Sequence, residues 1–282
     1  KKFLYIPFKT LRYVKKEKPD VVLSQGLIFP LQVIMLRLLV GKKCIIIVQH
    51  HGGKPYAGIK KYFQKIADRF IDAYIFTSSG NAKEWIEDKI IRDENKCFEV
   101  LEASTFFTKH DRQLARNKTG ISGDYNFLWV GRLNANKDPL TVLAAFEKYL
   151  SVNPEAKLYM IFQETDLLAE IITVITKNKL LQKAVILRGK ILHEDLPYWY
   201  SAADFYISGS HKEGSGYALI EAMSCCCIPL LTDIPSFRKI TANGQLGFLY
   251  EPGNAEQLVT LLMSLEHIDR EKLSDSILQH FA

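Results

Sequence analysis

The amino-acid sequence predicts an α/β fold built from doubly wound parallel sheets. Short strand-like segments alternate with helix-like segments along the 282 residues, which is the pattern of such folds. Residues 45–48 are apolar throughout, as expected for a strand that is buried on both faces. Gly214 and Gly216 stand where a predicted strand ends and a helix begins, which is where α/β proteins bind ligands.

The expected elements of the first half follow its apolar segments. Strands are expected at 21–23, 45–48, 74–76 and 98–101, with helices between them around 30–40, 58–71 and 79–90. The longest apolar run, at 31–40, contains Gln32 and Arg37. It is therefore too short and too polar for a membrane span and indicates a buried helix.

The second half repeats the alternation after a polar stretch. Residues 116–125 include Gly120 and Gly123 and are interpreted as a linker between two domains. Strands are then expected near 126–130, 157–162, 184–187, 204–208, 228–231 and 247–250. The chain is long enough for one large domain or two medium-sized domains.

Charge is unevenly distributed along the chain. The formal net charge is +6, but basic residues are in excess in residues 1–121 and acidic residues in 122–282. The basic first half could face anionic membrane lipid or an anionic acceptor, or could be a solvated surface. Nucleic acid is not an expected partner, because the sequence contains no recognised nucleic-acid-binding module.

The cysteines and apolar segments indicate an intracellular setting. The five cysteines form no C-x2-C pattern, and Cys225, Cys226 and Cys227 are contiguous. Three neighbouring thiols cannot easily bind one metal ion, so we expect reduced structural thiols. Neither a secretory signal nor a spanning segment is recognisable. We therefore expect a cytoplasmic protein, with peripheral contact at the inner face of the membrane left open.

The most informative segment is E-G-S-G-Y-A-L-I-E, which places Glu213 and Glu221 eight positions apart. Gly214 and Gly216 allow a sharp turn and a close approach of backbone to a ligand. The helix that follows offers unpaired N–H groups and the positive end of its dipole to a phosphate. The two carboxylates would accept hydrogen bonds from hydroxyl groups on either side of the phosphates. This chemistry indicates a nucleotide-sugar.

Two other interpretations of the segment remain open. Glu221 could be a solvated helix residue, because such glycine turns also occur by chance. A dinucleotide-binding fingerprint fits less well, since Leu219 occupies the position of its third glycine and Asp233 is nearer than its acidic residue should be.

In its wider context the segment resembles retaining glycosyltransferases of the GT-B fold with an E-x7-E motif, the glycosyl transferases group 1 type. Residues 213–233 are similar to the family's E-G-F-G-x4-E-A-M-A-C-G-x2-P. Three further blocks match in order, F-L-W-V-G-R-L-N-A-N-K-D-P at 127–139, S-A-A-D at 201–204 and G-Q-L-G-F-L-Y-E-P-G at 244–253. Ser215 and Cys226 depart from the pattern, in which an aromatic residue and a glycine are usual.

The resemblance implies a GT-B architecture, with two Rossmann-like domains facing a central cleft. On this basis we expect an incomplete acceptor-side domain at 1–118, a nucleotide-sugar-binding domain at 119–270 and the start of a C-terminal helical segment at 271–282. The family's initial strand and glycine-rich loop are not recognisable, so the resemblance also implies truncation at both ends.

The resemblance further implies transfer of a sugar from a nucleotide diphosphate-sugar donor with retention of configuration. The expected acceptor is a glycan or lipid-linked glycan. No D-x-D pair occurs in the chain, so no cofactor and no metal ion are expected. Two alternatives stay open, a related epimerase or phosphorylase and a non-catalytic nucleotide-binding fragment.

Cations and a histidine complete the predicted catalytic group. Arg132 and Lys137 flank the loop after the strand at 126–130, where they could neutralise the departing diphosphate. In isolation either would be an ordinary surface charge. His51 follows the strand at 45–48 and could orient the donor or move a proton, unless it is a structural loop histidine. The predicted catalytic residues are Arg132, Lys137, Glu213 and His51.

The predicted donor-binding residues surround the same segment. Arg188 and Ile191 belong to the loop that the family uses for the nucleobase, largely through backbone groups. Glu221 would bind the ribose hydroxyls. The full predicted set is Gly131, Arg188, Ile191, Gly214, Ser215, Gly216, Tyr217, Ala218 and Glu221.

Overall fold

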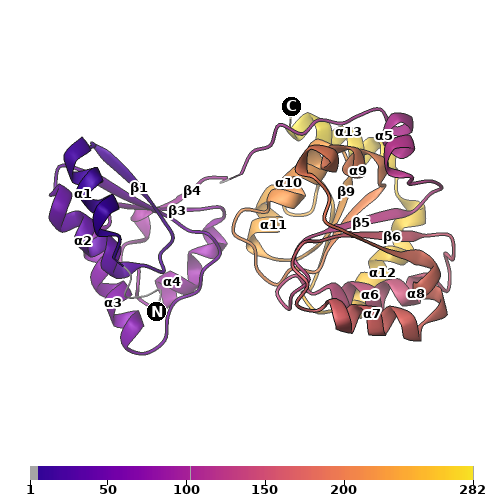
Figure 1. Ribbon diagram of the computed structural model, residues 1–282, viewed down its shortest axis with the longest axis horizontal. Coiled ribbons are helices and arrows are strands. Elements are labelled where there is room, and N and C mark those ends of the chain that lie inside the picture. The colour runs from indigo at the N-terminus through magenta and orange to yellow at the C-terminus, as the bar shows by residue number, and fades with distance from the viewer. Residues whose placement is uncertain (1–5, 102, 282) are drawn as a thin grey trace. The chain divides into compact units, whose positions relative to one another are not determined.

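The computed structural model describes residues 6–101 and 103–281 and forms two compact units (Figure 1). The first unit consists of residues 1–102 together with 213–215. The second unit consists of residues 103–212 and 216–282. Each unit has its own hydrophobic core.

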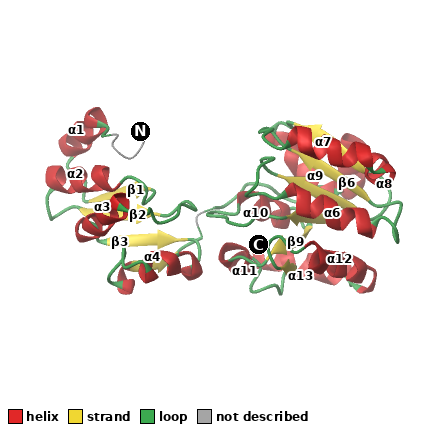
Figure 2. Ribbon diagram, turned by 90° about the horizontal axis from the view of Figure 1, so that it is seen from below, coloured by secondary structure: helices red, strands yellow, loops and turns green. Residues whose placement is uncertain are grey.

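The first unit is built on a parallel sheet with the strand order β1-β2-β3-β4. Figure 2 shows its strands and helices from a second direction. Alternate strand residues such as Ile46, Val48, Tyr74 and Phe76 pack into the core. The elements in chain order are α1 (Phe8–Glu17), β1 (Val21–Gln25), α2 (Pro30–Val40), β2 (Ile45–Gln49), α3 (Ile59–Ala67), β3 (Ala73–Phe76), α4 (Lys83–Glu87) and β4 (Cys97–Glu99).

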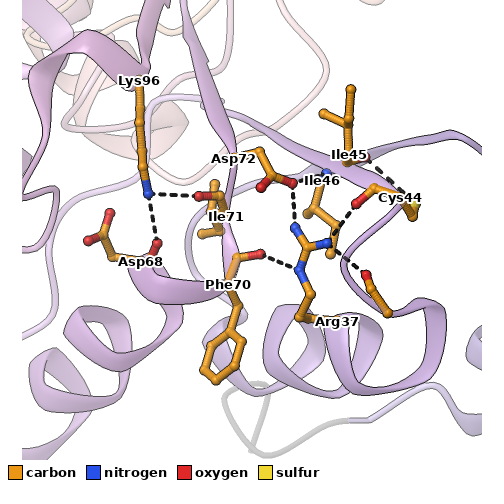
Figure 3. Close-up of polar contacts among 10 residues, drawn as sticks. Arg37, Cys44, Ile45, Ile46, Asp68, Phe70, Ile71, Asp72 and Lys96 are labelled. Carbon is orange, nitrogen blue, oxygen red and sulfur yellow. Dashed lines mark hydrogen bonds and ion pairs between the residues drawn. The ribbon is translucent and has the colours of Figure 1, made fainter.

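The apolar run at 31–40 forms α2, and its single charge has a structural role. Arg37 is buried, and its guanidinium donates to the carbonyls of Phe70 at 3.1 Å and Cys44 at 2.6 Å (Figure 3). The same group pairs with Asp72, whose carboxylate also accepts from the Ile46 amide at 2.7 Å. A buried charge requires such partners, and this cluster joins α2 to β2 and β3.

The second unit is a doubly wound parallel sheet with the order β10-β9-β8-β5-β6-β7. Because β5 lies in the middle, the chain first extends the sheet to one side and then returns to extend it on the other. Its first elements are α5 (Arg112–Thr119), β5 (Asn126–Val130), α6 (Pro139–Tyr149), β6 (Lys157–Ile161), α7 (Leu168–Lys177), α8 (Lys179–Ala184) and β7 (Val185–Gly189). Its remaining elements are α9 (Leu196–Ala202), β8 (Phe205–Ser208), α10 (Tyr217–Ser224), β9 (Ile228–Thr232), α11 (Pro235–Ile240), β10 (Phe248–Tyr250), α12 (Ala255–Ser264) and α13 (Arg270–Phe281).

The interpretation of residues 116–125 as a linker requires correction. Residues 112–119 form α5, which packs against α9 inside the second unit. Asp111 caps its first turn through a 2.8 Å bond from the Leu114 amide, and Gly120 ends it in the left-handed conformation. The polar composition therefore belongs to an exposed helix. The structure divides the chain at residues 102 and 103, where the sequence placed the division at 118 and 119.

Asp204 fixes α5 and α13 to the sheet. It lies just before β8 and is 6% exposed. Its carboxylate pairs with Arg112, with Arg116 at 3.9 Å and with Arg270 at 3.5 Å. It also accepts from the backbone amide of Asn126 at 2.9 Å. The aspartate of the S-A-A-D block thus has a structural role, in which one buried carboxylate is compensated by several cations.

Candidate functional site

In the second unit the chain adds strands on one side of β5 and then, from β8 onward, on the other side. The reversal of strand order therefore lies between β5 and β8, which are hydrogen-bonded neighbours. Ligands of doubly wound folds bind outside the carboxyl ends of the strands at such a reversal. The loops that leave this point are residues 131–138 after β5 and 209–216 after β8. These loops contain most of the residues that the sequence singled out.

The two loops are held together by direct contacts. The His211 amide donates to the Asn136 carbonyl at 2.8 Å, and the Asn136 side chain donates to the Lys212 carbonyl at 2.9 Å. The His211 ring lies 3.0 Å from the Asp138 carboxylate. A Cβ atom on Gly209 would lie 2.6 Å from the Asp138 carbonyl oxygen. Only glycine fits at 209 without displacing the neighbouring loop.

The predicted cations lie in the first of these loops. Arg132 is exposed, and its guanidinium lies 3.8 Å from the carboxylate of Glu164, whose side chain is 55% exposed. Such a pair at the surface contributes little stability. The Lys137 amide donates to Asn134, and the Lys137 stem passes near Gly131. Asp138 then begins α6 by accepting from the Thr141 amide at 3.1 Å.

The glycine segment leads into the amino end of α10. Glu213, Gly214 and Ser215 lie in the loop, and Gly216 is the N-cap, with a φ of 66°. A Cβ atom on Gly216 would lie 2.6 Å from the Ile240 side chain. The first turn then presents the amides of Tyr217 and Ala218, whose positions have no intrahelical acceptor. This is the geometry that binds phosphate groups.

Glu221 is 8% exposed, so its interpretation as a solvated helix residue is wrong. One carboxylate oxygen lies 2.9 Å from Nε2 of His193, and the other accepts from the Tyr200 hydroxyl at 3.3 Å. Burial, with Tyr206 and Glu221 close by, raises the pKa of Tyr200 well above its usual value. Tyr200 therefore stays protonated and able to donate, which fixes the orientation of the carboxylate.

His193 and Tyr200 are functional candidates that the sequence did not supply. His193 lies in the short 3-10 turn before α9, and its ring packs at a tilt on the ring of Phe107, with 4.8 Å between the two ring centroids. No spacing in the sequence links position 193 with 221. The Asp138–His211 pair was missed for the same reason, since it depends on the adjacency of β5 and β8.

Of the predicted nucleobase loop, Arg188 lies within β7 and only Ile191 lies in the loop that follows this strand, because β7 extends to Gly189. The Arg188 side chain donates to the Thr119 carbonyl at 3.3 Å and stacks on Trp199 at 5.0 Å. These contacts hold α5 and α9, so the side chain has a structural role. Ile191 packs against the hydrophobic core of the second unit.

In the first unit, the two adjacent histidines have different surroundings. His50 is buried, its Nε2 atom lies 2.9 Å from the Gly53 carbonyl, and its ring packs on Phe76. His51 is exposed and hydrogen-bonded to Gln25, which in turn donates to Gln49 at 3.3 Å. Of the pair, His51 is therefore the one accessible to a ligand.

Helix α10 ends at the cysteine cluster in a hydrogen-bond pattern that normally requires glycine. The Cys226 amide donates to the Met223 carbonyl at 2.9 Å and the Cys227 amide to the Ala222 carbonyl at 2.9 Å. These are the two bonds of a Schellman motif. Cys226 has a φ of 60°, the left-handed conformation that a side chain disfavours. The departure at 226 thus places backbone strain at the carboxyl end of α10.

The cysteines are free and mostly buried. Burial raises the pKa of the Cys225 thiol to about 12 and that of Cys227 well above its usual value. Within residues 6–101 and 103–281, no cluster of His, Cys, Asp or Glu is arranged to hold a metal ion. Within the same ranges, every helix is too short or too polar to cross a membrane.

Residues 111–277 match the family described as Glycosyl transferases group 1. Mannosylfructose-phosphate synthase of Agrobacterium fabrum is 28% identical over 62% of this chain and 38% of its own length. GDP-mannose:cellobiosyl-diphosphopolyprenol alpha-mannosyltransferase of Xanthomonas oryzae is 29% identical over 51% of this chain and 38% of its own. The chain thus spans less than half the length of these curated relatives.

Solved structures match nearly the whole chain. Sucrose-phosphate synthase of Thermosynechococcus elongatus aligns with a TM-score of 0.78 at 18% identity, over 97% of this chain and 72% of its own. Anabaena HepE in complex with UDP and glucose aligns with a TM-score of 0.78 at 15% identity, over 97% of this chain and 75% of its own. The expected fold, two parallel-sheet α/β units of the GT-B type, is thereby confirmed.

Proposed function

The chain belongs to the glycosyl transferases group 1 family, and from that premise we propose that it transfers a sugar from a nucleotide diphosphate-sugar to a glycan or lipid-linked glycan, with retention of anomeric configuration. The observation that carries the proposal is the pairing of a phosphate-compatible helix end with a buried, oriented carboxylate. The helix end consists of Gly216 and the backbone amides of Tyr217 and Ala218. The carboxylate is that of Glu221, which His193 and Tyr200 orient.

Glu221, the first turn of α10 and the four predicted catalytic residues each have a proposed task in this reaction. Glu221 accepts hydrogen bonds from the ribose hydroxyls, and the first turn of α10 receives the distal phosphate. Arg132 and Lys137 stabilise the charge that develops on the leaving diphosphate, so no metal ion is required. Glu213 binds the transferred sugar and is not assigned as a covalent nucleophile. His51 is a further candidate for contact with that sugar.

Calorimetric titration with UDP, GDP, ADP and CMP, each with and without EDTA, tests the donor site. We expect one nucleoside diphosphate to bind with an affinity that EDTA leaves unchanged. Absence of binding by every nucleotide would contradict the proposal. Loss of binding in the presence of EDTA would contradict the proposal that the donor binds without a metal ion.

Reaction products distinguish transfer from the related chemistries. Incubation with the matching nucleotide-sugar should give little turnover until an acceptor glycan is added. The anomeric proton coupling in the product should equal that of the donor. Turnover of the donor alone to an epimer, or phosphate-dependent release of the sugar, would instead identify the alternative activities.

The first unit is proposed to contact anionic lipid through α1. This helix carries Lys9, Arg12, Lys15 and Lys16, with Phe8 62% and Tyr13 65% exposed. Aromatic rings beside cations favour the surface of an anionic membrane. Co-sedimentation should occur with vesicles that contain phosphatidylglycerol and should fall as salt rises. Equal binding to neutral phosphatidylcholine vesicles would contradict the proposed contact with anionic lipid.

A further inference from the structure

The connecting segment, residues 103–111, precedes α5 and is fixed to the second unit by side chains of that unit. The His110 amide donates to the Ser201 hydroxyl at 3.0 Å, and the Cys225 thiol donates to the Thr108 carbonyl at 3.6 Å. The segment forms neither helix nor strand. It nevertheless has a defined position against α9 and the carboxyl end of α10.

Two adjacent phenylalanines of the connecting segment have opposite surroundings. Phe106 is 103% exposed. Phe107 is half-buried and packs against the hydrophobic core of the second unit. The Phe107 amide donates to the Thr105 hydroxyl at 3.1 Å, which closes a local turn. The backbone thus directs one ring to solvent and the next ring into the second unit.

The Phe107 ring packs on both residues that hold the Glu221 carboxylate. Its centroid lies 4.8 Å from that of His193 and 6.3 Å from that of Tyr200. Both separations lie in the range in which aromatic rings attract one another. His193 and Tyr200 are in turn hydrogen-bonded to the two oxygens of Glu221. A single ring therefore supports both partners of this carboxylate.

Of these two partners, His193 depends more on Phe107. Tyr200 belongs to α9 and is fully buried, so the surrounding core also fixes its ring. The His193 side chain is 72% exposed and lies in a three-residue 3-10 turn. Exposed side chains exchange rapidly between rotamers. The Phe107 ring limits that exchange and keeps Nε2 of His193 at 2.9 Å from Glu221.

We propose that Phe107 is a positioning residue of the nucleotide site. Its ring holds His193, and His193 orients the Glu221 carboxylate for the ribose hydroxyls, an inference that rests on the proposed function of Glu221. A group that is already oriented loses less conformational freedom when a ligand binds. Without the Phe107 ring, binding has to order the His193 side chain as well, so the nucleotide binds more weakly.

Titration calorimetry with UDP, GDP, ADP and CMP compares substituted chains with the unsubstituted one. Phe107→Ala should raise the Kd of the nucleotide that binds by about threefold to tenfold, because one further side chain has to be ordered. Phe107→Leu keeps most of the apolar volume at the core, lacks the ring and should change the Kd in the same direction. Phe107→Tyr keeps the ring and should bind as the unsubstituted chain does. Phe106→Ala removes an exposed ring, is the matched control and should leave the Kd unchanged.

The same substitutions combined with His193→Ala separate positioning from a general effect on the fold. In that background Phe107→Ala and Phe107→Leu should no longer change the Kd, because no imidazole remains to be held. A change of the same size with and without His193 would overturn the proposal. So would a Kd that Phe107→Ala and Phe107→Leu leave unaltered in the chain that retains His193.

NMR without nucleotide tests the contact itself. The three-bond couplings from Cγ of His193 to its backbone nitrogen and carbonyl carbon report whether the side chain keeps one rotamer. We expect one rotamer in the unsubstituted chain and in Phe107→Tyr, and averaged couplings in Phe107→Ala and Phe107→Leu. Couplings that are the same in all four proteins would overturn the proposal. If the unsubstituted chain binds no nucleotide, the proposed function fails, and the couplings still decide whether Phe107 holds His193.

Discussion

Nε2 of His193 lies 2.9 Å from Oε1 of Glu221 and joins the turn before α9 to the middle of α10. Together with the Tyr200 hydroxyl, it restricts the carboxylate before any ligand arrives. A group that is already oriented loses less conformational freedom on binding. This pair thus supports the interpretation of Glu221 as a binding residue.

Replacement of Glu221 by glutamine should weaken nucleotide binding while the fold is kept. The change removes the charge that strengthens a hydrogen bond from a ribose hydroxyl, a loss of about 1.5–3 kcal/mol, or roughly tenfold to a hundredfold in Kd. Titration calorimetry measures it. Glu170→Gln on α7 is the control and should bind as the unsubstituted chain does. An unchanged Kd for Glu221→Gln would remove Glu221 from the site.

Arg132→Ala should separate catalysis from stability. Its contact with Glu164 joins two exposed side chains, so the free energy of unfolding should change by no more than about 1 kcal/mol. If Arg132 stabilises the leaving diphosphate, kcat should fall by about a hundredfold to a thousandfold. Glu164→Ala is the control and should retain kcat. A fall in kcat of similar size in both variants would indicate a disturbed loop.

Cys226→Gly should stabilise the second unit. The left-handed conformation at 226 costs a residue with a side chain about 1–2 kcal/mol, a cost that glycine avoids. The gain should appear as a higher urea midpoint. Cys226→Ala keeps a Cβ atom and should show no such gain. Cys225→Gly, at a position with a φ of −94°, should lower the midpoint.

Gly209→Ala should disturb the paired loops. The new methyl group would meet the Asp138 carbonyl at 2.6 Å, and this overlap should cost about 1–3 kcal/mol of stability. Denaturation measures that cost, and calorimetry should show weaker nucleotide binding, because the loop carrying Arg132 is displaced. Unaltered stability would mean that the loop can move aside without cost.

Much of the architecture could be predicted from local patterns. The sequence predicts the helix at 30–40 and the strand at 126–130 correctly, as α2 and β5. In an α/β chain an apolar run of about ten residues indicates a buried helix, and one of about five residues indicates a buried strand. Residues 112–119 were not assigned to a helix, because α5 is stabilised by its contacts with α9 and Asp204, which lie far along the sequence. Polar composition alone resembles a linker.

The site was predictable where its signal lies within one loop. The glycine segment between Glu213 and Glu221 is such a signal, because backbone conformation and helix start are local properties. His193 and His211 were not predicted, since their partners Glu221 and Asp138 reach them only through the order of the strands. A residue whose role depends on tertiary adjacency has no signature in the spacing of a single sequence.

The two hydrophobic cores share no residue, and this has a consequence for calorimetry. Heat can melt one core while the other stays folded, so a scan of residues 1–282 should show more than one absorption peak, and a single Tm would not describe the chain. A nucleotide bound at α10 stabilises the core that holds it, so it raises the temperature of one of these peaks and leaves the temperature of the other unchanged. The peak that moves would identify the ligand-holding core.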